Sequence, residues 1–292
     1  MQDPPAESKQ SASRSAERAA QDARLQLRAG QIKHVVLVLS GKGGVGKTTV
    51  AVQLARALAA TGRETGLLDA DLHGPSVPVM MGLENEALAG SAQGMVPVEA
   101  GEKLKVMSIG FLAQDPDSAI IWRGPIKTGV LRQFVSDVAW GPLDYLVVDC
   151  PPGTGDEPLT VAQTFGRGAW AIIVTTPQRI AVADARRAVR FVGLVGLRLA
   201  GIVENMSGLT CPHCGDVIEL FRGGGGAALA ELAHVPLLGQ IPFHMALVLG
   251  ADHGDPELAP SSGPAASFRD LADKVITAVE TAETRTEPLS PP

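Results

Sequence analysis

Residues 40–49 read Ser40-Gly41-Lys42-Gly43-Gly44-Val45-Gly46-Lys47-Thr48-Thr49, and they decide the fold. An apolar run, Val35–Leu39, precedes them, and an amphipathic stretch of helical length, Lys47–Ala60, follows. The pattern G-x-x-x-x-G-K-[ST] between a strand and a helix is typical of a P-loop, in which glycines let backbone N–H groups surround bound phosphates. Lys47 would neutralise the β- and γ-phosphates, and the Thr48 hydroxyl would be a ligand of Mg²⁺.

Outward from this loop, short apolar runs alternate with amphipathic stretches of helical length. The alternation predicts βαβ units, and therefore an α/β fold: a single P-loop NTPase domain with a mostly parallel sheet and helices on both faces. The expected strands are Val35–Leu39, Thr65–Leu68, Leu104–Ile109, Tyr145–Val148, Trp170–Thr175, Leu199–Val203 and Pro236–Gly239. The expected helices are Lys47–Ala60, Ile126–Val138, Glu157–Thr164, Ala181–Val195, Ala227–Ala233 and Phe268–Thr281.

The domain organisation follows from changes in composition along the chain. Residues 1–30 are polar and lack the apolar segment of a signal peptide, so we expect a disordered tail there. Residues 31–282 show no break in composition and are expected to form the single domain. A frayed tail is expected at residues 283–292.

Composition argues against several classes of protein. The chain has 292 residues, a net charge of −6 and only 4% aromatic residues, which disfavours nucleic-acid binding through phosphate contacts or base stacking. No apolar run approaches the ~18 residues of a membrane span, so no membrane partner is expected. Three cysteines, an odd number, argue against a disulfide scaffold and indicate a reducing, cytoplasmic location.

Carboxylates follow two of the expected strands, at the edge where parallel sheets bind ligands. Asp69 and Asp71 follow the second strand, and Asp69 is expected to support the shell of a magnesium ion. Asp149 ends the apolar stretch Leu143–Asp149 in the manner of a Walker B aspartate, which holds Mg²⁺ through water. The turn-rich segment Pro151–Asp156 is expected to be a switch loop that senses the γ-phosphate.

Two further segments carry no complete motif. Asn205 is expected to end the strand Leu199–Val203, where its amide can pair with the edge of a base or form a turn. The run Gly223–Gly226 precedes an expected helix and could bind an anion, but no lysine, serine or threonine follows it. We interpret this run as a flexible link that lets the neighbouring cysteine pair move.

The cysteine pair Cys211-Pro212-His213-Cys214 has the spacing of a metal or cluster ligand set. Three interpretations are open. The pair could be a redox dithiol, or half of a zinc site completed by residues such as His213 or His234. It could also be half of a four-cysteine site that the same pair in a second protomer completes, since a two-fold axis brings identical loops together.

Several blocks resemble one group of P-loop ATPases. Lys42, at the second position of Gly-Lys-Gly-Gly-Val-Gly-Lys, resembles the lysine of the deviant Walker A class, which includes the MinD, ParA and nitrogenase-iron-protein relatives. From about Lys33 to Gly254 the chain resembles the Mrp-type iron–sulfur cluster carriers of that class. The blocks are Asp69-Ala70-Asp71-Leu72-His73-Gly74-Pro75-Ser76, Trp122-Arg123-Gly124-Pro125, Asp149-Cys150-Pro151-Pro152-Gly153-Thr154-Gly155-Asp156, Thr175-Thr176-Pro177-Gln178, and Asn205-Met206-Ser207 before the cysteine pair.

The resemblance implies an ATP-dependent carrier. It implies a homodimer that bridges a 4Fe–4S cluster through Cys211 and Cys214 of each protomer, and that transfers the cluster to apo-proteins with slow ATP hydrolysis. The implied catalytic residues are Lys42, Lys47 and Asp71. Lys42 would reach the partner's nucleotide, and Asp71 would position the attacking water. The implied nucleotide ligands are Gly41, Lys42, Gly43, Gly44, Val45, Gly46, Lys47, Thr48, Thr49, Asp149 and, for the adenine, Asn205.

The chain also departs from the family pattern. His73 stands where many relatives carry tyrosine, which we expect to matter little. Cys150 replaces an apolar residue and is expected to be a small core residue. The alternative function is that of a MinD- or ParA-like positioning ATPase. The acidic residues in Phe268–Thr281 oppose a membrane-binding helix, and the net charge of −6 disfavours DNA.

Overall fold

The computed structural model describes residues 28, 30–91, 94–112, 129, 131–132, 134, 136–211, 213–214, 216–221, 223–258 and 262–284. The expected N-terminal tail lies outside these residues except for 28 and 30, and the expected C-terminal tail lies outside them beyond Thr284. The block Trp122–Pro125 also lies outside the described residues.

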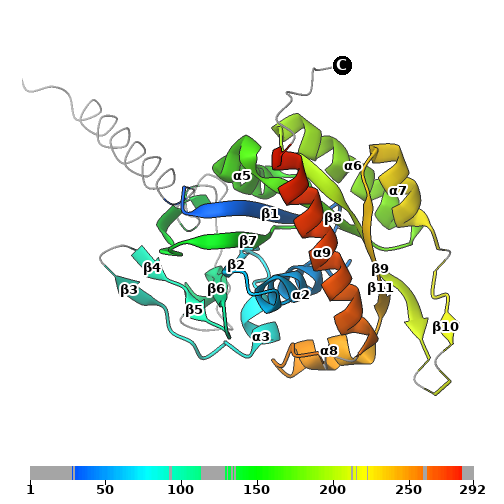
Figure 1. The fold of residues 1–292 in the computed structure, drawn as a ribbon, viewed down its shortest axis with the longest axis horizontal. Helices are drawn as coiled ribbons and strands as arrows, with labels where there is room; N and C mark the ends of the chain where they lie inside the picture. The colour runs from blue at the N-terminus through cyan, green and yellow to red at the C-terminus, as the bar shows by residue number, and fades with distance from the viewer. Residues whose placement is uncertain are drawn as a thin grey trace, which may run out of the picture.

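The described strands form a nine-stranded sheet and a separate two-stranded one (Figure 1). Their bounds are β1 (Ile32–Ser40), β2 (Thr65–Asp69), β3 (Ala89–Ser91), β4 (Gly94–Val96), β5 (Val98–Glu99), β6 (Leu104–Ser108), β7 (Leu143–Asp149), β8 (Trp170–Thr175), β9 (Arg198–Thr210), β10 (Val217–Ile218) and β11 (Leu237–Phe243). The order in the large sheet is β5-β6-β2-β7-β1-β8-β9-β10, and β11 also pairs with β9. The β5–β6 and β10–β9 pairs are antiparallel, and the other pairs in this sheet are parallel.

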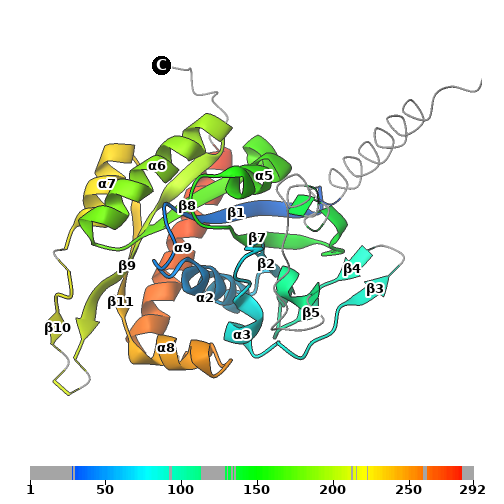
Figure 2. The ribbon, with the colours of Figure 1, turned by 180° about the vertical axis from the view of Figure 1, so that it is seen from behind.

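Helices cover both faces of the large sheet. Their bounds are α2 (Lys47–Ala60), α3 (Val77–Met81), α5 (Asp156–Phe165), α6 (Arg179–Val195), α7 (Gly225–Ala233), α8 (Met245–Asp252) and α9 (Gly263–Thr284). Helices α2 and α9 pack on one face, where Leu54 and Phe268 share a core with Val36. Helices α5, α6 and α7 pack on the other face around Leu37, and Figure 2 shows this side of the molecule. None of the described helices is both long and apolar enough to cross a membrane.

The predicted α/β architecture is confirmed, with shifted boundaries. Each expected strand occurs, because continuous apolar runs suit strands that are buried on both faces. The strand expected at Leu199–Val203 continues to Thr210, so Asn205 lies within β9 rather than at its end. It continues because β11 pairs with β9 as far as Leu209. Gly225 and Gly226 belong to α7, so only the earlier part of the glycine run is a link.

The sequence analysis missed some strands, and other elements end at different residues than expected. The strands β3, β4, β5 and β10 have two or three residues each, too few to show a periodicity. The helix expected at Ile126–Val138 is described only in part, and Val138 already forms a bridge with Met95. The strand expected to end at Ile109 ends at Ser108.

The strand order places three loops at one edge of the sheet. In β7, Asp149 is in register with Val38 of β1 and with Asp69 of β2. The Ala70 N–H donates to the Asp149 carbonyl over 3.0 Å, and the Gly153 N–H donates to the Ser40 carbonyl over 3.0 Å. The P-loop, the Asp71 loop and the loop after Asp149 therefore begin side by side.

Candidate functional site

The P-loop bends through two glycines with positive φ, Gly44 at 77° and Gly46 at 78°. A Cβ atom on Gly46 would lie 2.2 Å from Nδ2 of Asn205, so only glycine fits there. The same Nδ2 atom donates a hydrogen bond to the Val45 carbonyl over 2.9 Å. The amide predicted to recognise a base is therefore built into the wall of the phosphate loop.

A buried ion pair holds the P-loop against the end of β7. Lys47 Nζ lies 2.5 Å from Asp149 Oδ1, and the Thr48 hydroxyl donates to Asp149 Oδ2 over 2.7 Å. Burial alone would lower the pKa of Lys47, but the attraction and hydrogen bond of Asp149 outweigh it and raise that pKa. Burial raises the pKa of Asp149, and Lys47 and Thr48 oppose that rise.

Asp69 supports the neighbouring loop from below. Its Oδ1 atom accepts the Asp71 N–H at 3.1 Å, and its Oδ2 atom accepts the Val77 N–H at 3.2 Å and the Ser108 hydroxyl at 2.9 Å. Burial, and then the charge of Asp149, raise the pKa of Asp69 to about 7. Both of its oxygens thus hold the loop that carries Asp71, a role that the sequence analysis did not foresee.

A side-chain bridge connects the Asp71 loop to the segment after Asp149. His73 donates its backbone N–H to Asp71 Oδ1 at 3.2 Å, and its ring atom Nε2 lies 2.9 Å from Glu157 Oε1. Glu157 stands in the first turn of α5, directly after the predicted switch loop. His73 therefore connects the Asp71 loop to the helix that follows the predicted switch loop, and the expectation that histidine at this position matters little stays a prediction.

A cavity of about 220 Å³ opens beside Asn205. Thr49 and Met206 line one side of it, and Pro242, His244 and Leu247 line the other. Asn205 Oδ1 accepts no hydrogen bond from the described residues, so it is free to accept one from an exocyclic amine such as that of adenine. The sequence analysis did not predict that residues of β11 and α8 line this cavity. The carboxyl end of a parallel strand is a common place for a ligand site, so the end of β11 was a signal that could have indicated it.

The cysteine pair lies on a hairpin formed by β9 and β10 that projects from the sheet (Figure 1). The Cys211 N–H donates to the Asp216 carbonyl over 2.8 Å, which closes the hairpin. Cys214 is exposed and Cys211 is half-buried. Hydrogen bonds from the backbone N–H groups of Cys214 and His213, and then from the Cys214 thiol, lower the pKa of Cys211.

The described residues hold no group of three or more His, Cys, Asp or Glu side chains placed to bind a metal ion. A zinc site completed within one chain by His213 or His234 is therefore not formed by the described residues. The cysteine pair itself offers two accessible thiols, and one of them is biased towards thiolate. A shared site is the interpretation that needs no further ligand from this chain.

Cys150 is a core residue, as expected. It is 0% exposed and packs with Leu37 and Val148 on the face covered by α5 and α6. Burial raises the pKa of its thiol far above the ordinary range, so this thiol is inert at neutral pH.

One strand joins the two predicted sites. Glu204, Asn205 and Met206 are consecutive in β9, and Cys211 directly follows its last residue. Met206 has a φ of 55°, and the pairing of β9 with β11 shifts register between Ile241 and Phe243. Glu204, which the sequence analysis missed, is 0% exposed and accepts the Gly226 N–H at 2.6 Å and Gln240 Nε2 at 2.8 Å. Lys42 is half-buried; its carbonyl accepts the Ser40 hydroxyl at 2.9 Å, and its side chain forms no hydrogen bond or ion pair with the described residues.

Removal of Lys47 tests the buried ion pair. We expect Lys47→Ala to lower the free energy of unfolding by about 3 kcal/mol at pH 8, because Asp149 stays buried without a counter-ion. Lys47 opposes the rise in the pKa of Asp149, so its removal lets that pKa rise further; the native variant then keeps a proton that the unfolded chain has lost, and its stability falls more than that of wild type as pH rises. The loss should therefore be smaller at pH 5 than at pH 8 in urea unfolding.

The double variant Lys47→Ala/Asp149→Asn is the matched control, since it removes the uncompensated charge as well. It should regain most of the stability at pH 8. An equal loss for Lys47→Ala at both pH values would contradict this assignment.

Thiol reactivity tests the hairpin. We expect iodoacetamide to alkylate Cys211 at lower pH than Cys214, because the pKa of Cys211 is lowered, and to leave Cys150 unmodified in the native protein. Rates are followed by mass spectrometry in Cys214→Ser and Cys211→Ser. The Cys214→Ser variant keeps both backbone donors to Cys211, so most of the shift should survive in it. Equal pH profiles for the two thiols would refute the prediction.

Comparisons with known proteins place this geometry in a family. Residues 31–276 match the model of the ParA family described as NUBPL iron-transfer P-loop NTPase. The chain is 49% identical to a cytosolic Fe-S cluster assembly factor NUBP2 homolog of Trichoplax adhaerens, over 85% of this chain and 96% of that protein. It is 43% identical to an iron-sulfur cluster carrier protein of Methanocaldococcus jannaschii, over 90% of each chain.

Solved structures agree with the sequence matches. A nucleotide-binding protein of Archaeoglobus fulgidus in complex with ADP has a TM-score of 0.72 and 39% identity, over 80% of this chain and 92% of that chain. The cell division ATPase MinD of Pyrococcus furiosus has a TM-score of 0.59 at 22% identity, over 83% of this chain and 98% of that chain, and shares the fold. The chain therefore belongs to the ParA-type family of iron-transfer P-loop NTPases, which includes Fe-S cluster assembly factors and carriers.

Proposed function

We propose that this protein is an ATP-dependent carrier in the cytoplasm. It binds a 4Fe–4S cluster between the cysteine pairs of a homodimer, transfers the cluster to apo-proteins and hydrolyses ATP slowly. One observation carries the proposal: strand β9 contributes Asn205 to the P-loop and ends at the accessible pair Cys211 and Cys214. The nucleotide state and the cargo would thus act on the same strand.

The nucleotide would lie along the described P-loop. Its phosphates would accept hydrogen bonds from the backbone N–H groups between Gly41 and Thr49, and its adenine would enter the cavity beside Asn205. The similar archaeal protein in complex with ADP supports a nucleotide ligand. Two hard oxygen donors, the Thr48 hydroxyl and the Asp149 carboxylate, lie 2.7 Å apart and suit Mg²⁺. Mg²⁺ held there would supply positive charge beside the phosphates.

Hydrolysis would require the buried ion pair to open. Lys47 would leave Asp149 for the β- and γ-phosphates, and Asp71 would orient a water molecule for attack on the γ-phosphorus. A bond forms from the water oxygen to that phosphorus, and the bond to the oxygen that bridges to the β-phosphate breaks. ADP, phosphate and the proton that the water loses are the products. Lys42 would act on the nucleotide of the partner protomer.

The cluster is cargo, and its site needs two chains. Each chain supplies two thiols, and a cubane cluster takes four thiolate ligands. Two hairpins related by a two-fold axis would supply all four. The names of the similar proteins as Fe-S cluster assembly factors and carriers support this cargo.

Anaerobic reconstitution tests the cargo. After incubation with iron and sulfide, we expect the wild-type protein to hold about four iron and four sulfide per dimer, with a broad absorbance in the visible range. Cys211→Ala/Cys214→Ala should lose both the absorbance and the dimer in sedimentation. Cys150→Ala is the matched control and should load like wild type, because Cys150 lies in the core. A double variant that holds the same chromophore as wild type would disprove the shared site.

ATP turnover tests the role of Asp71. We expect Asp71→Asn to lower kcat by about 100-fold, the usual size of an effect on a group that orients a reacting water, and to change the Kd for ATP by less than about threefold. Phosphate release and equilibrium binding measure the two quantities. Asp270→Asn, at a surface pair with Lys274, is the control and should leave both unchanged. A parallel loss of ATP binding would show that Asp71 acts on the fold of the site.

A further inference from the structure

The outer face of α6 carries a basic stripe. Arg179, Ala183, Arg186, Arg190 and Leu194 follow one another at intervals of three or four residues, so they share one face of the helix. All five are exposed, and Leu194 is 88% exposed. We name these five residues the α6 stripe.

The arginines of the α6 stripe are unpaired within the described residues. On the adjoining face, Arg187 forms an ion pair with Asp184 at 3.3 Å, but the side chains of Arg179, Arg186 and Arg190 form no hydrogen bond or ion pair with a described residue. Helix α6 holds four arginines and a single acid, whereas the whole chain has a net charge of −6. Neighbouring unpaired cations repel one another, and a bound anionic group would relieve that repulsion.

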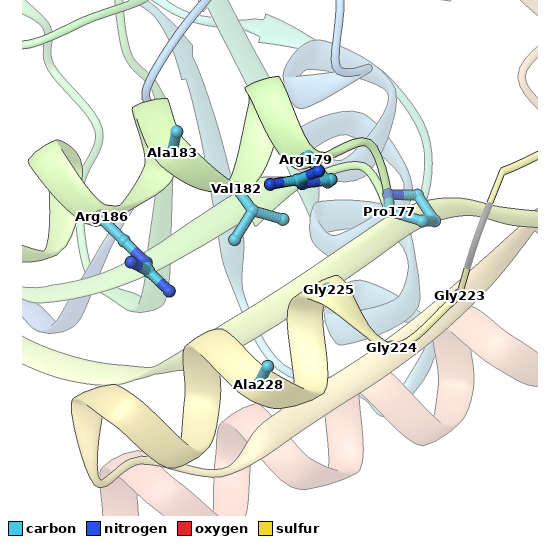
Figure 3. Close-up of a pocket in the computed structure, with 9 residues that line it drawn as sticks. All are labelled: Pro177, Arg179, Val182, Ala183, Arg186, Gly223, Gly224, Gly225 and Ala228. Carbon is cyan, nitrogen blue, oxygen red and sulfur yellow. The ribbon is translucent and has the colours of Figure 1, made fainter.

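A groove lies beside this stripe. It has a volume of about 400 Å³ and is lined by Arg179, Arg186 and Val182 of α6, by Ala228 of α7 and by the glycine link before α7. Figure 3 shows Arg186 and Val182 extending from α6 toward α7, with Ala228 pointing back. The groove therefore combines a small apolar floor with cations along one side.

One N–H group at the start of α7 is already used within the protein. The Gly226 N–H donates to the buried carboxylate of Glu204 at 2.6 Å. The positive charges that line the groove are those of Arg179 and Arg186, and Figure 3 shows Arg186 extending from α6 toward α7. A ligand for them must carry several negative charges at helical or extended spacing, together with apolar groups for Val182, Ala228 and Leu194.

We propose that the α6 stripe and its groove dock an acidic, amphipathic peptide segment of the apo-protein that receives the cluster. The apolar floor favours a polypeptide over a nucleic acid, and the net negative charge of the chain repels a long polyanion. The position in the chain supports a recipient, because a segment separated from β10 of the cysteine hairpin by four residues contributes Gly223 and Gly224 to the groove. The inference that the docked segment belongs to a recipient protein rests on the proposed carrier function.

Fluorescence polarisation with a labelled (Glu-Glu-Leu)4 peptide tests the docking surface. We expect saturable binding that weakens with salt, since exposed charges contribute to it. Arg179→Ala/Arg186→Ala should weaken binding by about tenfold, the combined effect of two exposed charge contacts. The matched control is Arg56→Ala/Arg187→Ala, which removes the same charge from arginines that already have partners, and it should bind like wild type.

Several results would overturn the proposal. The first two are an equal loss of peptide affinity in the control variant and equally tight binding of the uncharged peptide (Gln-Gln-Leu)4. The third is tighter binding of a labelled dT12 oligonucleotide than of the acidic peptide. The fourth is a changed oligomeric state in Arg179→Glu/Arg186→Glu, which would indicate that a second copy of the chain occupies the surface. The assay uses neither ATP nor cluster, so its failure is distinct from that of the carrier function. With loaded dimer, excess (Glu-Glu-Leu)4 should slow cluster transfer to an apo-ferredoxin, and an unchanged rate would remove the recipient from the proposal.

Discussion

The buried ion pair of Lys47 and Asp149 is the interaction on which the rest of the site depends. It joins the start of α2 to the end of β7, two elements more than a hundred positions apart, in a region from which water is largely excluded. A buried charge is tolerated only beside its counter-charge, so the pair fixes the P-loop against the sheet edge. The carboxylate of Asp71 is then held within the field of the same lysine, and the charge of Asp149 acts on the buried Asp69.

Strand β9 extends this organisation beyond the nucleotide site. Its middle contributes Asn205 to the P-loop and Glu204 to the first turn of α7, and its end forms the hairpin of the cysteine pair. A parallel strand usually ends at the ligand edge of the sheet. Here β9 pairs with β11 beyond that edge. The residues of the predicted nucleotide site and of the predicted cluster site therefore follow one another along a single strand and the hairpin at its end.

Much of the fold and part of the site could be predicted from the sequence. The glycines and lysine of the P-loop, and the apolar run that ends in Asp149, are local patterns, and the structure brings them together. The support of the Asp71 loop by Asp69 and Ser108, the bridge from His73 to Glu157, and the cavity wall from α8 were not predictable. Each joins residues distant in the sequence, and periodicity reports only on a residue's own element.

The close fit between Gly46 and Asn205 has a consequence for how this protein can vary. The asparagine amide occupies the volume that a side chain at position 46 would need, and it binds the carbonyl of the preceding residue. Enlarging residue 46 would displace the amide from its place beside the cavity, and shortening residue 205 would leave the Val45 carbonyl without its donor. The shape of the P-loop and that of the cavity beside Asn205 therefore cannot drift separately in evolution, because two residues 159 positions apart share a single packing volume.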